Sequence, residues 1–326
     1  MMNAESDNAF KGILVVRPGE GGEATENYQT LNHSLQSDTP LWLEMSWDDP
    51  IAHVWLIRHS GLPESSCQAV LNENTRPRSF MDEQGNLVLI LRVINAQASP
   101  LEDRLVSLRL IVGKKRVFSL CRYQPIAVTL MRKFLVSSEE SFQPELLITK
   151  LLRWIQEEIN EEAFALTEAL GEIEALLERD KPPLDEISQV RKRTNELQRY
   201  LAPQRTVLSQ LRQQSELKKV SELESDWREL TNELQLSLEE VEMANRRLLI
   251  FQDEVRSMLN QRTTHTLYLL SLVTFFFLPL SFITGFLGMN ISFPWGSSAD
   301  AFWVLLVTIG GILLAQALLI RRLGWL

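Results

Sequence analysis

The chain has 326 residues, of which 45% are hydrophobic and 23% are charged, a length typical of more than one domain. Its 33 Lys and Arg residues against 42 Asp and Glu residues give a formal net charge of −9, so there is no electrostatic reason to expect nucleic acid as a partner. The two cysteines and four histidines exclude a disulfide framework or a thiolate metal cage built from one chain, and we expect a reducing compartment.

The N-terminal region, residues 1–142, mixes strand and helix signals. Short β-branched or alternating segments bounded by turn residues predict strands at 86–95, 104–113 and 115–123. Amphipathic stretches predict helices near residues 55–71 and at 126–135. We therefore expect an α/β domain with a small sheet, as part of an α+β chain.

Residues 143–262 contain few helix breakers and many Leu, Glu, Gln and Arg residues, a composition that favours long helices. Pro182 and Pro183 separate the first two of them. A capping-box pattern begins a third helix at Ser221. We expect this helix to continue to Gly288 as a rod of roughly 100 Å.

An apolar stripe with a period of about 3.5 residues follows this third helix. Its positions are Leu223, Trp227, Leu230, Leu234, Ser237, Val241, Ala244, Leu248, Phe251, Val255 and Met258. We expect this stripe to be a packing seam against the two preceding helices, with direct self-association of the helix as the alternative.

Residues 263–326 are expected to form a membrane domain. Stretches without charged residues predict transmembrane helices at about 264–288 and 301–320, each long enough to cross a bilayer. Arg262 precedes the first span, Arg321 and Arg322 follow the second, and the connecting loop has neither Lys nor Arg. The positive-inside rule thus predicts a multi-pass protein of the plasma (inner) membrane with both termini in the cytoplasm, so that the helices of residues 143–262 form a cytoplasmic stalk.

A polar stripe follows one face of the first span, in a different phase from the apolar seam. The candidate pore-lining residues on or beside it are Thr264, Leu267, Leu270, Ser271, Thr274, Leu278, Ser281 and Gly285. One interpretation is helix packing, with the hydroxyls bonded to their own backbone. The other is a water-filled axis enclosed by several copies, because one chain with two spans cannot enclose a pore. Leu267 and Leu270 are candidates for an apolar gate in that axis.

The first span ends with Gly288-Met289-Asn290, preceded by LPLSFITGFL and followed by the second span and a basic tail. In this order, after an α/β domain and a long helix, the motif resembles the signature of the CorA family of divalent-metal ion transporters over nearly the whole chain. The segments NENTRPR at 72–78 and YLAPQR at 200–205 resemble the zinc-transporter branch, ZntB, more than the magnesium channels. The outer loop ISFPWGSSAD departs from that branch.

The resemblance implies a homopentamer in membrane lipid, with a central pore lined by the first membrane helix. It also implies that Asn290 receives a largely hydrated divalent cation at the outer mouth, supported by Gly288 and Met289. The transported cation is a substrate, and no cofactor is expected. The implied activity is zinc uptake, with proton coupling left open by the sequence.

Two alternatives to zinc uptake remain from the residues themselves. Neutral oxygens suit hydrated magnesium, whereas zinc prefers His or thiolate ligands that the polar stripe does not offer. A CorA-type channel for magnesium, cobalt or nickel is therefore the first alternative. A membrane-tethered sensor without transport is the second, and the direction of transport is not determined by the sequence.

Residues outside the polar stripe add few sites. Asp253 and His265 are candidates for a cytoplasmic cation site, although a solvated charge and an interfacial anchor are the simpler interpretations of them. Four acidic residues are expected to form a solvated face that at most concentrates cations: Glu157, Glu158, Glu161 and Glu162. Because no phosphate loop, nucleophile elbow or metalloprotease motif occurs, we do not expect an enzyme.

Overall fold

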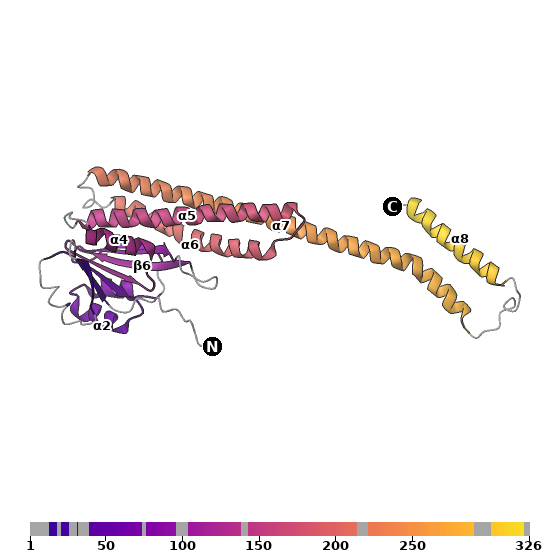
Figure 1. The fold of residues 1–326 in the computed structure, drawn as a ribbon, viewed down its shortest axis with the longest axis horizontal. Coiled ribbons are helices and arrows are strands. Elements are labelled where there is room, and N and C mark those ends of the chain that lie inside the picture. Colours follow the sequence, from indigo (N-terminus) through magenta and orange to yellow (C-terminus); the bar gives the residue numbers. More distant parts are fainter. Residues whose placement is uncertain are drawn as a thin grey trace. The chain divides into compact units, whose positions relative to one another are not determined.

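The structure of the chain is a computed structural model (Figure 1). It describes residues 13–17, 21–25, 31, 39–73, 76–95, 104–137, 143–213, 221–289 and 301–322. These residues group by their contacts into two compact units, Met1–Gln252 and Asp253–Leu326. Helix α7 (Ser221–Leu287) begins in the first unit and ends in the second.

The first unit contains a seven-stranded sheet in the order β2-β1-β3-β7-β6-β5-β4. Its strands are β1 (Ile13–Arg17), β2 (Gly21–Thr25), β3 (Leu41–Ser46), β4 (Arg78–Met81), β5 (Leu87–Ile94), β6 (Leu105–Val112) and β7 (Arg116–Cys121). Strands β3 and β7 pair in parallel, and all other neighbours pair antiparallel. The three expected strands are confirmed as β5, β6 and β7, whereas β1 to β4 were not predicted.

Helices cover both faces of this sheet. On one face, α2 (Pro50–His59) and α3 (Glu64–Leu71) contribute Trp55, Leu56 and Cys67 to a buried core that also includes Leu43 of β3. On the other face lies α4 (Ile126–Ser137), whose Arg132 pairs with the buried Glu44 of β3 at 2.9 Å. All six residues of β3 are buried, because this strand is central and covered on both sides.

Two long helices pack beside α4 and the sheet: α5 (Pro144–Glu178) and α6 (Leu184–Gln213). The two prolines between them fall in the connecting turn, as expected. The first part of α7 lies alongside this pair (Figure 1). It contacts α5 through Arg247, whose guanidinium lies 2.8 Å from Glu174, and α6 through Asn245, which donates to Gln198 at 3.3 Å.

The expected packing seam of α7 is confirmed within the first unit. The burial of Leu223 is not described, and the other eight members there are buried: Trp227, Leu230, Leu234, Ser237, Val241, Ala244, Leu248 and Phe251. The polar member, Ser237, meets a polar partner, because its hydroxyl donates to Asn160 at 2.7 Å and accepts from Gln156 at 3.0 Å. The seam therefore packs against α5 and α6 of the same chain.

The acidic face of α5 differs from the expectation of a solvated surface. Glu157 and Glu161 are exposed, but Glu162 is buried between Arg104 at 3.1 Å and Arg193 at 2.8 Å. Glu158 accepts the amide hydrogen of Ala127, in the first turn of α4, at 2.9 Å, and burial raises the pKa of Glu158 to about 7. The prediction was wrong for these two residues because they lie on the face of α5 that packs against the domain.

Candidate ion pathway

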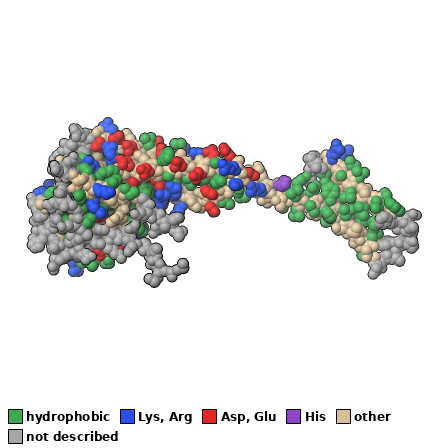
Figure 2. Space-filling model, in the orientation of Figure 1, with side chains coloured by type: hydrophobic (Ala, Val, Ile, Leu, Met, Phe, Trp, Pro, Cys, Tyr) green, Lys and Arg blue, Asp and Glu red, His purple; other side chains and the backbone are tan. Residues whose placement is uncertain are grey.

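The second unit consists of the end of α7 and helix α8 (Ala301–Arg322). Both helices are long and apolar enough to cross a membrane. The apolar stretch of 18 residues that meets this criterion is 0% buried in α7 and 11% buried in α8. A core helix of a soluble protein would be mostly buried. Figure 2 shows hydrophobic side chains gathered over this unit, whereas charged side chains gather over α5, α6 and the start of α7.

Helix α8 packs against α7 through one regularly spaced face. Its least exposed residues are Leu305, Ile309, Ile312, Gln316 and Ile320. The partly covered residues of α7 at this depth also share one face: Tyr268, Leu272, Phe276, Pro279, Leu280 and Ile283. The side-chain amide of Gln316 donates to the backbone carbonyl of Phe275 at 2.7 Å, which fixes the contact between the two helices.

The eight candidate pore-lining residues lie on a different face of α7. At about 100° per residue, their mean direction is roughly 150° from that of the partly covered residues. All eight, from Thr264 to Gly285, are exposed in the single chain. Helix α8 therefore leaves the polar stripe uncovered.

The hydroxyls of this unit are partly satisfied by their own helix. Thr274, on the polar stripe, donates to the carbonyl of Leu270 at 2.9 Å, and Thr284, off the stripe, donates to that of Leu280 at 3.0 Å. Such bonds leave the oxygen lone pairs free to accept from water. The stripe can thus present acceptors to a hydrated cation without breaking the helix.

The signature motif lies where α7 ends. The amide of Gly288 donates to the carbonyl of Thr284 at 2.9 Å, and a Cβ atom at Gly288 would lie only 3.1 Å from that oxygen. Glycine fits this tight end, while Met289 is 45% exposed. Asn290, to which the resemblance assigns the contact with the cation, lies outside the described residues.

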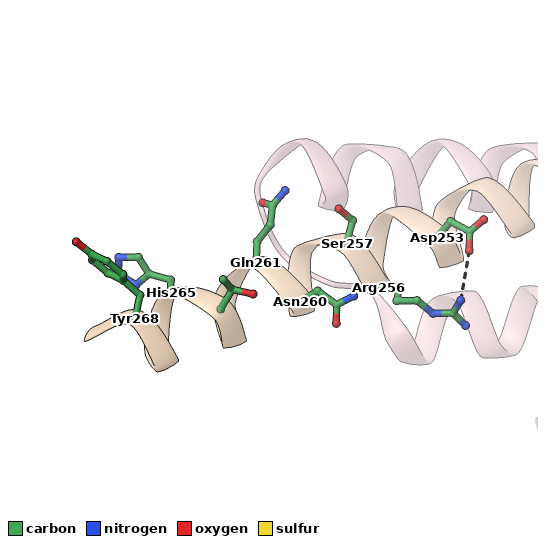
Figure 3. A pocket seen from close by; sticks show the side chains of 8 residues that line it. Asp253, Arg256, Ser257, Asn260, Gln261, His265 and Tyr268 are labelled. Carbon is green, nitrogen blue, oxygen red and sulfur yellow. Dashed lines mark ion pairs between the residues drawn. The ribbon is translucent and has the colours of Figure 1, made fainter. Parts of the chain in front are cut away.

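A shallow groove follows the start of the second unit (Figure 3). Its lining residues are Asp253, Arg256, Ser257, Asn260, Gln261, Thr264, His265 and Tyr268. Asp253 lies 3.8 Å from Arg256, and both side chains are about 80% exposed, so this pair contributes little to stability.

The two candidates for a cytoplasmic cation site do not meet. Asp253 and His265 are separated by roughly 18 Å along the axis of α7, so one chain cannot place both on one ion. Among the described residues, no group of three or more His, Cys, Asp and Glu side chains could hold a metal ion. The polar stripe and the motif that follows it remain the candidate pathway.

Comparison with known proteins agrees with this architecture. Residues 37–322 match the family of the CorA-like Mg2+ transporter protein. The chain is 32% identical to the divalent cation transporter CmaX of Pseudomonas aeruginosa over 333 residues, which cover 100% of both chains. It is 27% identical to the zinc transport protein ZntB of Pectobacterium carotovorum over 94% of each chain.

Solved structures show the same fold. Full-length CmaX matches with a TM-score of 0.75 and 30% identity over 99% of this chain and 100% of that one. The CorA magnesium transporter of Methanocaldococcus jannaschii matches with a TM-score of 0.75 and 18% identity over 100% of both. The expected fold, an α/β domain followed by long helices and two apolar C-terminal helices, is confirmed. The chain belongs to the CorA family of divalent-cation transporters.

Proposed function

We propose that five copies of this chain form a central pore through the inner membrane and that each copy lines it with the polar stripe of α7. The observation that carries this proposal is the position of the stripe, which is exposed and faces away from α8. Hydroxyls gain nothing from lipid, so a face that α8 leaves uncovered is best explained by water and by further copies of α7. The number five follows from the family resemblance.

The same geometry supports an orientation for the two helices in the assembly. Because α8 packs on the side of α7 opposite the stripe, α8 lies between the pore helix and lipid. Arg262, Arg321 and Arg322 mark the cytoplasmic ends of the spans. Both termini then lie in the cytoplasm, and Asn290 lies at the outer mouth.

The chemistry of this pathway suits a cation that keeps most of its water. No Asp or Glu lies between Arg262 and Met289, so the stripe offers neutral oxygens rather than ionised ligands. Such acceptors bind the water shell of a divalent cation without stripping it. Leu267, Leu270 and Leu278, exposed on the same side of α7, form apolar rings that close the path by excluding water.

Zinc is the proposed substrate, and its movement is proposed to be uptake. Support comes from the ZntB relatives and from the segments at 72–78 and 200–205 that resemble that branch. Magnesium is the second candidate, because neutral oxygens suit its hydrated ion. The relative CmaX is named a divalent cation transporter, without a particular metal. Proton coupling would have to use groups other than carboxylates in the spans.

Flux into proteoliposomes tests this proposal. The purified chain is reconstituted, and zinc and magnesium uptake are measured with and without an inward proton gradient, against empty vesicles and Asn290→Ala. Zinc uptake that rises with the gradient and is lost in the variant would support a proton-coupled zinc transporter. Magnesium uptake indifferent to the gradient would replace zinc by magnesium, and no flux of either metal would favour a tethered sensor.

A further inference from the structure

A proline lies inside the membrane part of α7 and removes one backbone hydrogen bond. Pro279 has no amide hydrogen, so it cannot donate to the carbonyl four residues earlier, that of Phe275. An unsatisfied carbonyl is costly in a membrane, and proline is tolerated there only where another group bonds to the freed oxygen. The carbonyl of Phe275 therefore needs a donor from outside the regular helix pattern.

Gln316 supplies that donor from the neighbouring helix. Its side-chain nitrogen lies 2.7 Å from the oxygen of Phe275, and the residue is only 8% exposed. The hydrogen bond thus joins α8 to the one carbonyl whose usual partner is Pro279. Gln316 has no signal in the sequence beyond being a neutral amide in an apolar span, so it was not predicted as a functional residue.

The amide is an expensive group to bury for packing alone. Among the described residues, its oxygen, Oε1, is buried without a hydrogen-bond partner. Burying that oxygen costs free energy that an apolar side chain of the same shape would avoid. The contact with Phe275 is the favourable interaction that offsets this cost.

The location of the bond connects it to the ion pathway. The segment that lacks its own hydrogen bond, residues 275–279, contains Leu278 and directly follows Thr274, and both are residues of the polar stripe. A helix that loses a bond at proline bends more easily. The contact with Gln316 restricts this bending and holds both stripe residues in place.

We propose that Gln316 is a positioning residue for transport: its amide replaces the hydrogen bond that Pro279 removes and fixes residues 275–279 of the pore helix. This inference rests on the proposed function, in which α7 lines the pore. Gln316 itself does not contact the cation. Its role is to set the position of Thr274 and Leu278.

A double-mutant cycle tests this role in the full chain. Gln316→Met removes the donor and keeps the length of the side chain, and Pro279→Ala restores the amide hydrogen of α7. We measure cation uptake in proteoliposomes and the melting temperature in detergent for both single variants and the double variant. Thr308→Val is the matched control on α8, because Thr308 bonds to its own helix, at Val304, 2.8 Å away.

Gln316→Met is expected to lower uptake about threefold to tenfold, the range given by the strength of hydrogen bonds between membrane helices. In the Pro279→Ala background the same substitution should lower uptake and melting temperature much less, because α7 then satisfies its own carbonyl. Gln316→Glu should retain most activity, since a buried carboxyl group that keeps its proton still donates. Thr308→Val should behave like the unmodified chain.

Three outcomes would overturn the inference. Equal losses in both backgrounds would show that residue 316 acts through packing alone. Activity retained in Gln316→Met would show that the donor is not needed. Equal losses in Gln316→Met and Gln316→Glu would show that a donor at this position does not restore transport. Both results count even where Pro279→Ala does not fold. A different result would separate the two proposals. If the melting temperatures show that Gln316→Met costs less in the Pro279→Ala background, but neither the unmodified chain nor any variant transports a cation, the hydrogen bond is supported and the proposed function is rejected.

Discussion

The two halves of α7 place polar and apolar side chains in opposite ways. Up to Phe251, the apolar seam is buried against α5 and α6, and its one polar member, Ser237, is buried with hydrogen-bond partners. In the second unit, apolar residues such as Phe277 and Phe282 are 64% and 71% exposed, and one face of the helix carries the polar stripe. The same helix therefore meets two environments, because water drives apolar groups inward whereas lipid penalises polar groups without partners.

Truncation of the seam should give the largest effect. Leu234 is 0% exposed, so Leu234→Ala is expected to lower the free energy of unfolding by about 2–5 kcal/mol through lost burial and the cavity it leaves. Chemical denaturation in detergent measures this. The control is Leu236→Ala on the same helix, since Leu236 is 60% exposed and its loss should cost less than about 0.5 kcal/mol. Equal costs would show that the outer face of α7 is also covered in the assembled protein.

The half-buried carboxyl group of Glu158 on α5 should make the first unit sensitive to pH. Burial raises the pKa of Glu158 from its ordinary 4.5 to about 7, so the folded chain binds the proton more tightly than the unfolded chain. The associated stability is complete below about pH 4.5 and is lost as pH rises through about 7.

Glu158→Gln should remove this loss while retaining an oxygen that accepts from Ala127. Above pH 7 the variant is expected to be more stable by about 1–2 kcal/mol, a value reduced because the side chain is partly exposed. Thermal melting at pH 5 and pH 8 measures the difference. Glu157→Gln, which changes an exposed neighbour, should leave the pH dependence nearly intact, and a flat profile for the unmodified chain would contradict the assignment.

In the second unit, loss of a stripe hydroxyl should change flux and leave stability unchanged. Thr274→Val is expected to reduce divalent-cation uptake about twofold, because one acceptor for the hydration shell is lost. Thr284→Val is the matched control, since both hydroxyls bond to their own helix but Thr284 lies off the stripe. Similar reductions in the two variants would argue that the hydroxyls act through the helix backbone rather than through the pore.

The exposed charge at the start of the second unit should give the smallest effect. Asp253 is about 80% exposed, 3.8 Å from Arg256. Asp253→Asn is therefore expected to leave the melting temperature unchanged and to reduce uptake by less than about twofold, by lowering the local concentration of cations. The reduction should disappear at high salt, since exposed charges are screened. A larger loss that persists in salt would identify Asp253 as part of a specific cation site.

Prediction from the sequence was most successful where a periodic pattern continued for many residues. The seam of α7 and the strands β5 to β7 each have a repeated local signal, and Pro182 and Pro183 mark a break directly. Strands β1 to β4 are short. In β3, for example, Glu44 and Ser46 indicate an exposed face, but the structure buries all six residues, with Glu44 paired to Arg132 of α4.

The burial of single polar residues could not be predicted in the same way. Glu158 and Glu162 resemble their exposed neighbours Glu157 and Glu161 in sequence, and only packing against α4 and α6 separates the two pairs. Gln316 likewise has no sequence signal beyond being an amide in an apolar span, although Pro279 marks the carbonyl that needs a donor.

The sequence by itself determined which segments are helices, which two have membrane length, and that hydroxyls and glycines share one face of the first span. These properties depend on local spacing, because a helix repeats every 3.6 residues wherever it lies. Only the tertiary structure decided that α8 covers the opposite face, that Gln316 reaches the carbonyl of Phe275, and that Glu162 is buried and Glu158 half-buried on α5. Those properties depend on contacts between residues distant in the chain, which the spacing of residues within one helix does not specify.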